Sequence, residues 1–252
     1  LSLMSANAIP RAVVFWGRAG DNDTVLAAAR AHPDRFIAFA SVSPERRAYR
    51  ELWTRQDPTL VAALDAALRG GAFRGIGEIS VSHFPSPGFP EADFSPGGPV
   101  MTGIMELARS YRLPVLIHCE ITRMAEFEAL LAANRDVAVI WAHGGYTPYF
   151  LARRFVERHP NLTYELSART WRHHPRSPDY TIFMTDDTVW PEWRKLIEDH
   201  PTRFIVGTDA SNRSREADQQ KIDSVRALLA QLPEPARGLV AQENLLRLVG
   251  TR

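Results

Sequence analysis

The sequence predicts an α/β protein of the (β/α)8 type, a TIM-like barrel, on three observations. Short apolar runs rich in Val and Ile alternate with amphipathic, helix-favouring stretches along the whole chain. Three of the helical stretches stop at a His-Pro pair and lead at once into an apolar run. Long connections, at 81–98 and 169–189, follow apolar runs, whereas connections from helix back to run are short. This asymmetry is typical of parallel βα units that carry their working loops at the strand carboxyl ends.

Seven apolar segments are expected to form the parallel strands. They are Ala12–Trp16, Ile37–Val42, Arg74–Ser80, Pro114–Glu120, Val137–His143, Leu162–Ala168 and Ile205–Asp209. Nearly continuous apolar runs of this length predict strands that are buried on both faces. A closed barrel needs an eighth strand, and the residues after Leu1 read like the tail of a first helix. We therefore expect the first strand to be missing from this chain and to lie upstream of Leu1.

Helices are expected between these strands. They are Asp23–Ala31, Thr59–Gly70, Val100–Arg112, Met124–Ala133, Pro148–Arg158, Pro191–Asp199 and Gln219–Leu232. Proline disfavours helix at the residue before it, so His32, His159 and His200, each followed by proline, are expected to mark helix ends. No shift in composition separates a second domain, so residues 1–252 are expected to form a single barrel domain.

The composition of the chain excludes several classes of binding partner. The chain holds 30 Lys and Arg against 29 Asp and Glu, a net charge of +1, which predicts no nucleic-acid partner. No apolar run approaches the roughly 18 residues that span a bilayer, so no membrane partner is expected. One cysteine, Cys119, excludes an intrachain disulfide and a cysteine-rich zinc site. The expected partner is a small-molecule substrate, and the sequence leaves homo-oligomerisation and the cellular compartment open.

Four metal-competent side chains lie at the carboxyl ends of different predicted strands. His118 and His143 each close an apolar run, Glu78 interrupts one, and Asp209 stands where the last run meets its loop. A buried carboxylate without a partner would cost several kcal/mol. Strand alternation sends these four side chains toward one mouth of the barrel. Each histidine alone could be a core histidine bonded to a backbone carbonyl, but the coincidence of four favours a shared metal site.

The ligand types indicate which metal would bind. Two imidazoles and two carboxylates suit zinc best, with manganese or iron as less selective alternatives, and one or two ions fit the set. The positive charge of the ion would also make the buried carboxylates tolerable. The sequence therefore predicts a divalent-metal centre built from Glu78, His118, His143 and Asp209.

The same residues carry a resemblance that covers essentially the whole chain. The segments are GIGEI at 75–79, PVLIHCE at 114–120, VIWAHGG at 139–145, FIVGTDAS at 204–211 and ENLLRLVG at 243–250. In these segments the chain resembles the amidohydrolase superfamily, and specifically its amidohydrolase-related (amidohydrolase 2) branch of TIM-barrel metal-dependent hydrolases. The WAHGG and GTDAS segments are the specific ones, whereas GIGEI alone would be weak.

The resemblance implies a role for each of the four residues. His118 becomes a metal ligand on the fifth barrel strand, and His143 becomes a second-metal ligand or the residue that polarises the substrate. Asp209 becomes both a metal ligand and the proton acceptor for the attacking water. Glu78 matches the bridging carboxylate of binuclear members. The family also supplies a His-x-His pair from its first strand, and this chain has none, since its adjacent pair His173-His174 lies in a loop.

The function that the resemblance implies is hydrolysis, in which metal-activated water attacks an amide, lactone or ester-type bond of a small substrate. Three alternatives stay open: a metal-dependent decarboxylase of the same superfamily, a metal-free lactonase, and a non-catalytic degenerate barrel. An anionic, partly aromatic substrate is compatible with the loop residues His83, Arg123, Arg169, Trp171, Arg172 and His174. Cys119 follows His118 and is expected to point away from the mouth and to serve packing.

Overall fold

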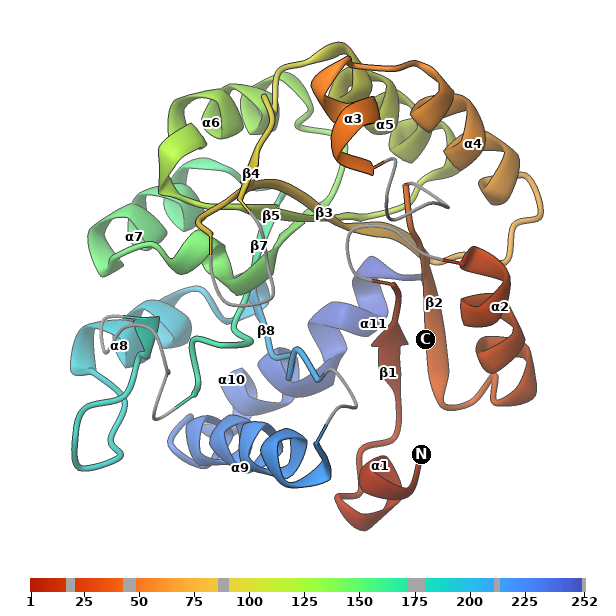
Figure 1. The fold of residues 1–252 in the computed structure, drawn as a ribbon. Coiled ribbons are helices and arrows are strands. Elements are labelled where there is room, and N and C mark those ends of the chain that lie inside the picture. The colour runs from red at the N-terminus through yellow and green to blue at the C-terminus, as the bar shows by residue number, and fades with distance from the viewer. Residues whose placement is uncertain (17–20, 43–48, 86–90, 172–179, 211–213, 251–252) are drawn as a thin grey trace. The chain divides into compact units, whose positions relative to one another are not determined.

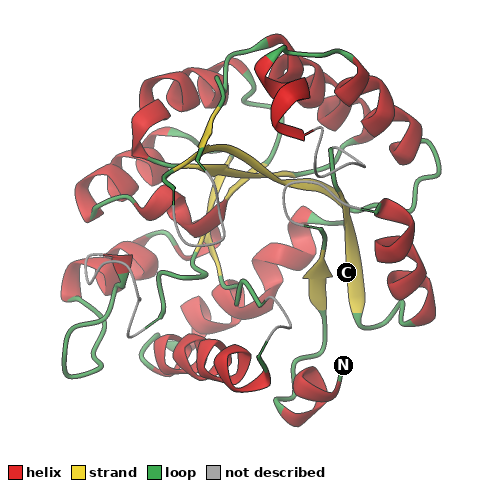
Figure 2. Cartoon of the chain, viewed as in Figure 1, coloured by secondary structure: helices red, strands yellow, loops and turns green. Residues whose placement is uncertain are grey.

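The computed structural model describes residues 1–16, 21–42, 49–85, 91–171, 180–210 and 214–250. Parallel strands alternate with helices along the chain (Figures 1 and 2), as the sequence predicts. The chain divides into two compact units, Leu1–Ile140 and Trp141–Arg252. The single barrel domain over 1–252 stays a prediction. Within the described ranges, none of the helices is long and apolar enough to cross a membrane.

The first unit is built on parallel strands. Strands β1 (Ala12–Val14), β2 (Phe36–Ala40), β3 (Gly75–His83) and β5 (Val115–Cys119) pair in that order, each parallel to the next. Strand β6 (Val139–Trp141) follows β5 in the sheet, and its last residue opens the second unit. The parallel pairing brings the carboxyl ends of β3 and β5 to one edge of the sheet. Glu78 and His118 stand on these two strands.

The helices of the first unit cover the parallel strands. They are α1 (Ser2–Ala6), α2 (Asn22–Ala31), α3 (Tyr49–Thr54), α4 (Thr59–Leu68), α5 (Pro99–Tyr111), η1 (Ile121–Arg123) and α6 (Met124–Ala133). Helices α2 and α4 both contact β2, and α4 also packs on α5 (Figure 1). The apolar stripes of these helices supply buried side chains such as Leu60, Leu64 and Phe127. Burying each of these stabilises the unit by about 1.5–3 kcal/mol.

The second unit continues the same alternation. It contains η2 (Ala142–Tyr146), α7 (Tyr149–Arg158), β7 (Leu162–Glu165), α8 (Pro191–Asp199), η4 (Pro201–Arg203), β8 (Phe204–Ile205), α9 (Arg215–Ala230), α10 (Glu234–Gly238), the π-helical turn η5 (Leu239–Glu243) and α11 (Asn244–Leu248). Strands β7 and β8 are parallel. The aromatic rings of Trp141, Phe155, Tyr164 and Phe204 pack together in its core, with centroids 5.0–5.6 Å apart in successive pairs.

The expected element boundaries hold to within a few residues, with three corrections. Strand β3 runs on to His83 because a two-residue antiparallel strand, β4 (Ala92–Asp93), pairs with its end. The strand expected at Val137–His143 ends at Trp141, and the strand expected at Ile205–Asp209 ends at Ile205. After Trp141 the backbone enters a left-handed conformation at His143, which ends ladder pairing. After Ile205 the N–H of Val206 donates to the carbonyl of Val240 in η5 instead of to a neighbouring strand. His32, His159 and His200 do stand at the ends of α2, α7 and α8.

Asn244 anchors the C-terminal helix to the start of β8. Its fully buried side-chain amide donates to the carbonyls of Pro201 at 2.7 Å and Phe204 at 2.8 Å. We expect Asn244→Ala to lower the free energy of unfolding by about 2–4 kcal/mol, because both buried carbonyls lose their donor. Urea unfolding would measure the loss, with Gln242→Ala, an exposed side-chain amide two residues earlier, as a control of small effect. An unchanged midpoint for Asn244→Ala would contradict this anchoring role.

Candidate metal centre

Glu78 reaches the site from a distorted part of β3. The pairing of β3 with β5 shifts register between Ile76 and Ile79, so Glu78 lies in an irregular stretch of the strand. Gly77 precedes it with φ +125°, and a Cβ at this position would run into the backbone carbonyl of Leu116 on β5. Only glycine fits both the conformation and the close approach. The glycine of the GIGEI segment therefore allows β3 to bend where the carboxylate projects.

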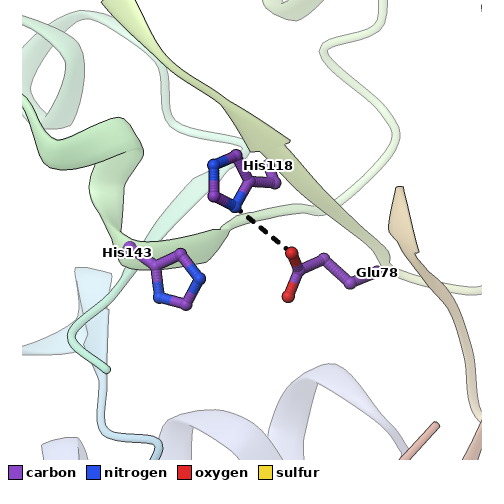
Figure 3. A group of neighbouring side chains, drawn as sticks. All are labelled: Glu78, His118 and His143. Carbon is purple, nitrogen blue, oxygen red and sulfur yellow. Dashed lines mark ion pairs between the residues drawn. The ribbon is translucent and has the colours of Figure 1, made fainter. Parts of the chain in front are cut away.

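His118 lies between two carboxylates. Its Nδ1 is 3.2 Å from Oε1 of Glu78, the ion pair drawn in Figure 3. Its Nε2 is 2.8 Å from Oε1 of Glu120, two residues further along the chain. His118 is 5% exposed and Glu120 is 2% exposed, so water screens this arrangement little. A hydrogen-bond acceptor at each ring nitrogen favours the protonated, positively charged form of this buried imidazole.

The electrostatics of the cluster follow from these contacts. Burial by itself would lower the pKa of His118, but the hydrogen bonds to Glu120 and Glu78 raise it to about 9. Burial would raise the pKa of Glu120, but the hydrogen bonds from His118 and His83 lower it to about 2. The two shifts agree with each other, since each partner stabilises the charged form of the other. Without a metal, His118 is therefore an imidazolium at neutral pH.

Glu120 and His83 are site residues that the four-residue prediction omits. His83 Nδ1 is 2.6 Å from Oε1 of Glu120, and the backbone N–H of Phe84 donates to the other carboxylate oxygen at 2.8 Å. His83, His118 and Glu120 are all buried and offer ligand atoms within 4.8 Å of one another. The sequence did hold a signal for Glu120, because it is a carboxylate directly after an apolar strand, like Asp209. The sequence pattern places His83 only among the loop residues, because it does not predict the extension of β3.

His143 stands in a tight left-handed turn. Residues His143, Gly144, Gly145 and Tyr146 all have φ between +51° and +57°. A Cβ at Gly144 would overlap the ring of Tyr164, so this glycine is required by space as well as by conformation. The His143 ring stacks on Tyr146 at 5.2 Å, and Tyr146 stacks on Tyr180 at 4.4 Å. At this turn the imidazole of His143 thus packs on a stack of two tyrosine rings.

Two further residues of the second unit hold His143. Ser167 lies with its hydroxyl oxygen 2.7 Å from His143 Nδ1, and the carboxylate of Glu165 accepts the backbone N–H of His143 at 3.0 Å. Glu165 ends β7 and is buried, and this burial raises its pKa above the ordinary value. The sequence prediction omits both residues. Glu165 carries the same signal as Glu78, a carboxylate in an apolar strand.

Asp209 lies beyond β8 in the second unit. It has φ +47° and is exposed, and its backbone carbonyl accepts a hydrogen bond from Lys221 Nζ at 2.6 Å. Lys221 belongs to α9, which begins at the capping residue Ser214, whose hydroxyl accepts the N–H of Ala217. The lysine therefore ties the loop that carries Asp209 to the first turns of α9.

The residues expected to hold an anionic substrate differ in their surroundings. Arg123 is already paired with Asp93 at 2.7 Å and Glu126 at 2.6 Å, and His83 is bonded to Glu120. Arg169 is buried, donates to the carbonyl of Thr147 at 2.9 Å and lies 5.0 Å from the ring of Trp193. Arg172 and His174, like the pair His173-His174, lie outside the described residues. Trp171 lies under Lys221, whose Nζ is 4.7 Å from its ring.

Cys119 is a packing residue. It is fully buried, and burial raises the pKa of its thiol, which keeps it protonated and unreactive.

Parallel strands alternate with helices in this chain, as in α/β proteins of the TIM-barrel type. Buried histidine and carboxylate groups at the carboxyl ends of these strands could bind a metal. The chain belongs to the amidohydrolase family, whose model matches residues 1–251. A comparison with the curated proteins found no match.

Solved structures of similar fold span nearly the whole chain. An uncharacterised TIM-barrel protein from Bordetella bronchiseptica matches with a TM-score of 0.70 and 16% identity, over 99% of this chain and 80% of that one. An amidohydrolase from Burkholderia multivorans matches with a TM-score of 0.67 and 16% identity, over 100% and 87%. A 5-carboxyvanillate decarboxylase from Novosphingobium aromaticivorans, complexed with manganese, matches with a TM-score of 0.58 and 16% identity, over 99% and 78%. These matches confirm the TIM-barrel fold class.

Proposed function

We propose that this protein is a metal-dependent hydrolase, in which water attacks an amide, lactone or ester-type bond of a small substrate. The observation that carries the proposal is the pairing of buried His118, near the carboxyl end of β5, with the partly buried Glu78 on β3, whose Oε1 lies 3.2 Å from His118 Nδ1. Membership of the amidohydrolase family supports a hydrolytic reaction. The manganese complex of the similar decarboxylase supports a divalent metal for this fold.

The donor groups fit a divalent cation. His118 is buried between two carboxylates, and a cation among them would replace the proton that now holds the cluster together. We propose Glu78, His118, His143 and Asp209 as the residues that hold the ion, with zinc first and manganese or iron as alternatives. Glu120 would then accept a hydrogen bond from the second ring nitrogen of His118, the usual arrangement behind a metal-bound histidine.

A bound divalent ion would supply a Lewis acid that polarises the substrate oxygen and acidifies water. Within the chain, Asp209 would take a proton from the attacking water on its carboxylate and return it to the leaving group. The Glu78 carboxylate would place a negative charge next to the cation. The stack on Tyr146 would keep the His143 ring in place. The exposure of Asp209 suits a group that must reach the substrate.

The test is turnover by the metal-loaded full chain on a panel of lactones, amides and esters with a carboxylate. We expect hydrolysis that is lost on chelation and restored by zinc or manganese. Asp209→Asn should retain the metal and lose at least about 100-fold in kcat, since the proton acceptor is gone. The matched control is Asp199→Asn in the surface pair with Lys195. Unchanged turnover in Asp209→Asn would remove this residue from the mechanism.

A metal-dependent decarboxylase is the second candidate, and the similar 5-carboxyvanillate decarboxylase favours it. The same assays separate the two reactions if aromatic carboxylic acids are added to the panel and released CO2 is measured. Hydrolysis without CO2 supports the first proposal. Release of CO2 from an aromatic acid, with no hydrolysis of any ester, would replace it by the second.

A further inference from the structure

Three hydrogen-bond donors converge on the buried carboxylate of Glu165 in the second unit. Its Oε2 accepts the Ser167 hydroxyl at 2.7 Å and the backbone N–H of His143 at 3.0 Å. Its Oε1 accepts the backbone N–H of Ser167 at 2.8 Å. Two of these donors are backbone N–H groups, which cannot reverse their role. Both oxygens of Glu165 are therefore used as acceptors.

This arrangement determines what Ser167 offers to His143. A serine hydroxyl has one proton, and here that proton is directed at Glu165. Toward His143 Nδ1, at 2.7 Å, the Ser167 oxygen can then only accept. The backbone carbonyl of Ser167 lies 3.2 Å from the same Nδ1 and is also an acceptor. Two acceptors at Nδ1 require that this nitrogen carries the ring proton.

We infer that Glu165, acting through the Ser167 hydroxyl, is a positioning residue that keeps the proton of His143 on Nδ1 and the lone pair on Nε2. The inference deepens the proposed function and rests on it for the place of His143 in the metal centre. A lone pair on Nε2 can bind a metal ion or take a proton, but it cannot donate a hydrogen bond to a substrate oxygen. Of the two roles that the family resemblance left open for His143, the inference therefore selects the ligand and not the polarising donor.

Gly207 lies directly against the carboxylate of Glu165 and leaves room for it. A Cβ on Gly207 would run into Oε1 of Glu165 and lie 3.4 Å from Cβ of Ser167. The glycine of the GTDAS segment thus leaves the space that Glu165 occupies. The three parts of the arrangement come from β7, from the residues after β7 and from those after β8, so the fold of the second unit maintains it.

The test is the tautomer of His143 in the full chain, free of metal, at about pH 8, where an ordinary imidazole is neutral. Long-range proton–nitrogen NMR correlations of 15N-histidine-labelled protein distinguish the two tautomers, and the His143→Gln spectrum assigns the signal. We expect the Nδ1–H form. Ser167→Ala should shift the tautomer ratio toward Nε2–H by about threefold to tenfold, the equivalent of one hydrogen bond. Glu165→Gln should shift it the same way, because its amide group donates where the carboxylate accepts.

The control is Ser224→Ala, which removes another buried serine hydroxyl of the same unit, in α9, and should leave the ratio unchanged. Wild-type His143 in the Nε2–H or the doubly protonated form, or no shift in Ser167→Ala, would overturn the inference. A parallel zinc titration keeps the proposals apart. The Nδ1–H form in a protein that binds no zinc would refute the proposed metal centre and leave the positioning role standing.

Discussion

His118→Gln is expected to lower the affinity for zinc or manganese by at least about 100-fold. The variant removes the nitrogen ligand on β5, and loss of a residue behind a ligand already costs about 10–100-fold in such sites. It also leaves Glu78 and Glu120 without the imidazole that now lies between them. Equilibrium dialysis with metal analysis, or competition with a chromophoric chelator, would measure the change. Binding equal to that of the unaltered chain would refute His118 as a ligand.

Three further variants provide a control and test on which side of His118 the ion lies. His32→Gln is the matched control, since His32 is an exposed histidine at the end of α2 in the same unit. Glu78→Gln should cost more affinity than Glu120→Gln if the ion lies on the Nδ1 side of His118, as proposed. The reverse order would place the ion at His83, His118 and Glu120, whose ligand atoms lie within 4.8 Å of one another.

Metal affinity is expected to rise steeply with pH. The proton on His118 competes with the ion, and its pKa is about 9. Well below that pH the apparent affinity should increase about tenfold per pH unit. This gives about 50-fold from pH 7 to pH 9, where His118 is half protonated, and the affinity should then level off. Glu120, with a pKa of about 2, stays ionised throughout and adds no slope. A titration against a chelator of known pH dependence would measure this, and a flat profile would contradict the paired state of His118.

The raised pKa of His118 also makes the stability of the metal-free protein depend on pH. Because folding raises the pKa of His118 from 6.5 to about 9, this residue contributes stability that is complete below pH 6.5 and is lost as the pH rises through 9. The melting temperature of the protein in the presence of a chelator should therefore fall as the pH rises from 6.5 through 9. In His118→Gln the loss from this residue should disappear.

The fold class, the family and most element boundaries could be predicted from the residues alone. Apolar runs and His-Pro junctions are local signals, and they placed β5, α6 and α8 nearly where the structure has them. That Glu78 and His118 lie close together could also be predicted, because strand alternation directs both side chains to the same mouth of the barrel. Glu120 and Glu165 carried the same signal, a carboxylate within or just after an apolar strand, but periodicity does not say which partner such a group meets.

The hydrogen-bond partners of the site residues could not be predicted in this way, because they depend on long-range packing. The register shift at Gly77 and the extension of β3 to His83 set which carboxylate meets each nitrogen of His118. The left-handed turn at His143 replaced the expected strand end and placed that ring against Ser167. The physical reason is that hydrogen bonds form over about 3 Å, and shifts of one residue or one turn change every partner. Local patterns determine where strands begin and end, whereas bulges, turns and long-range packing determine these contacts.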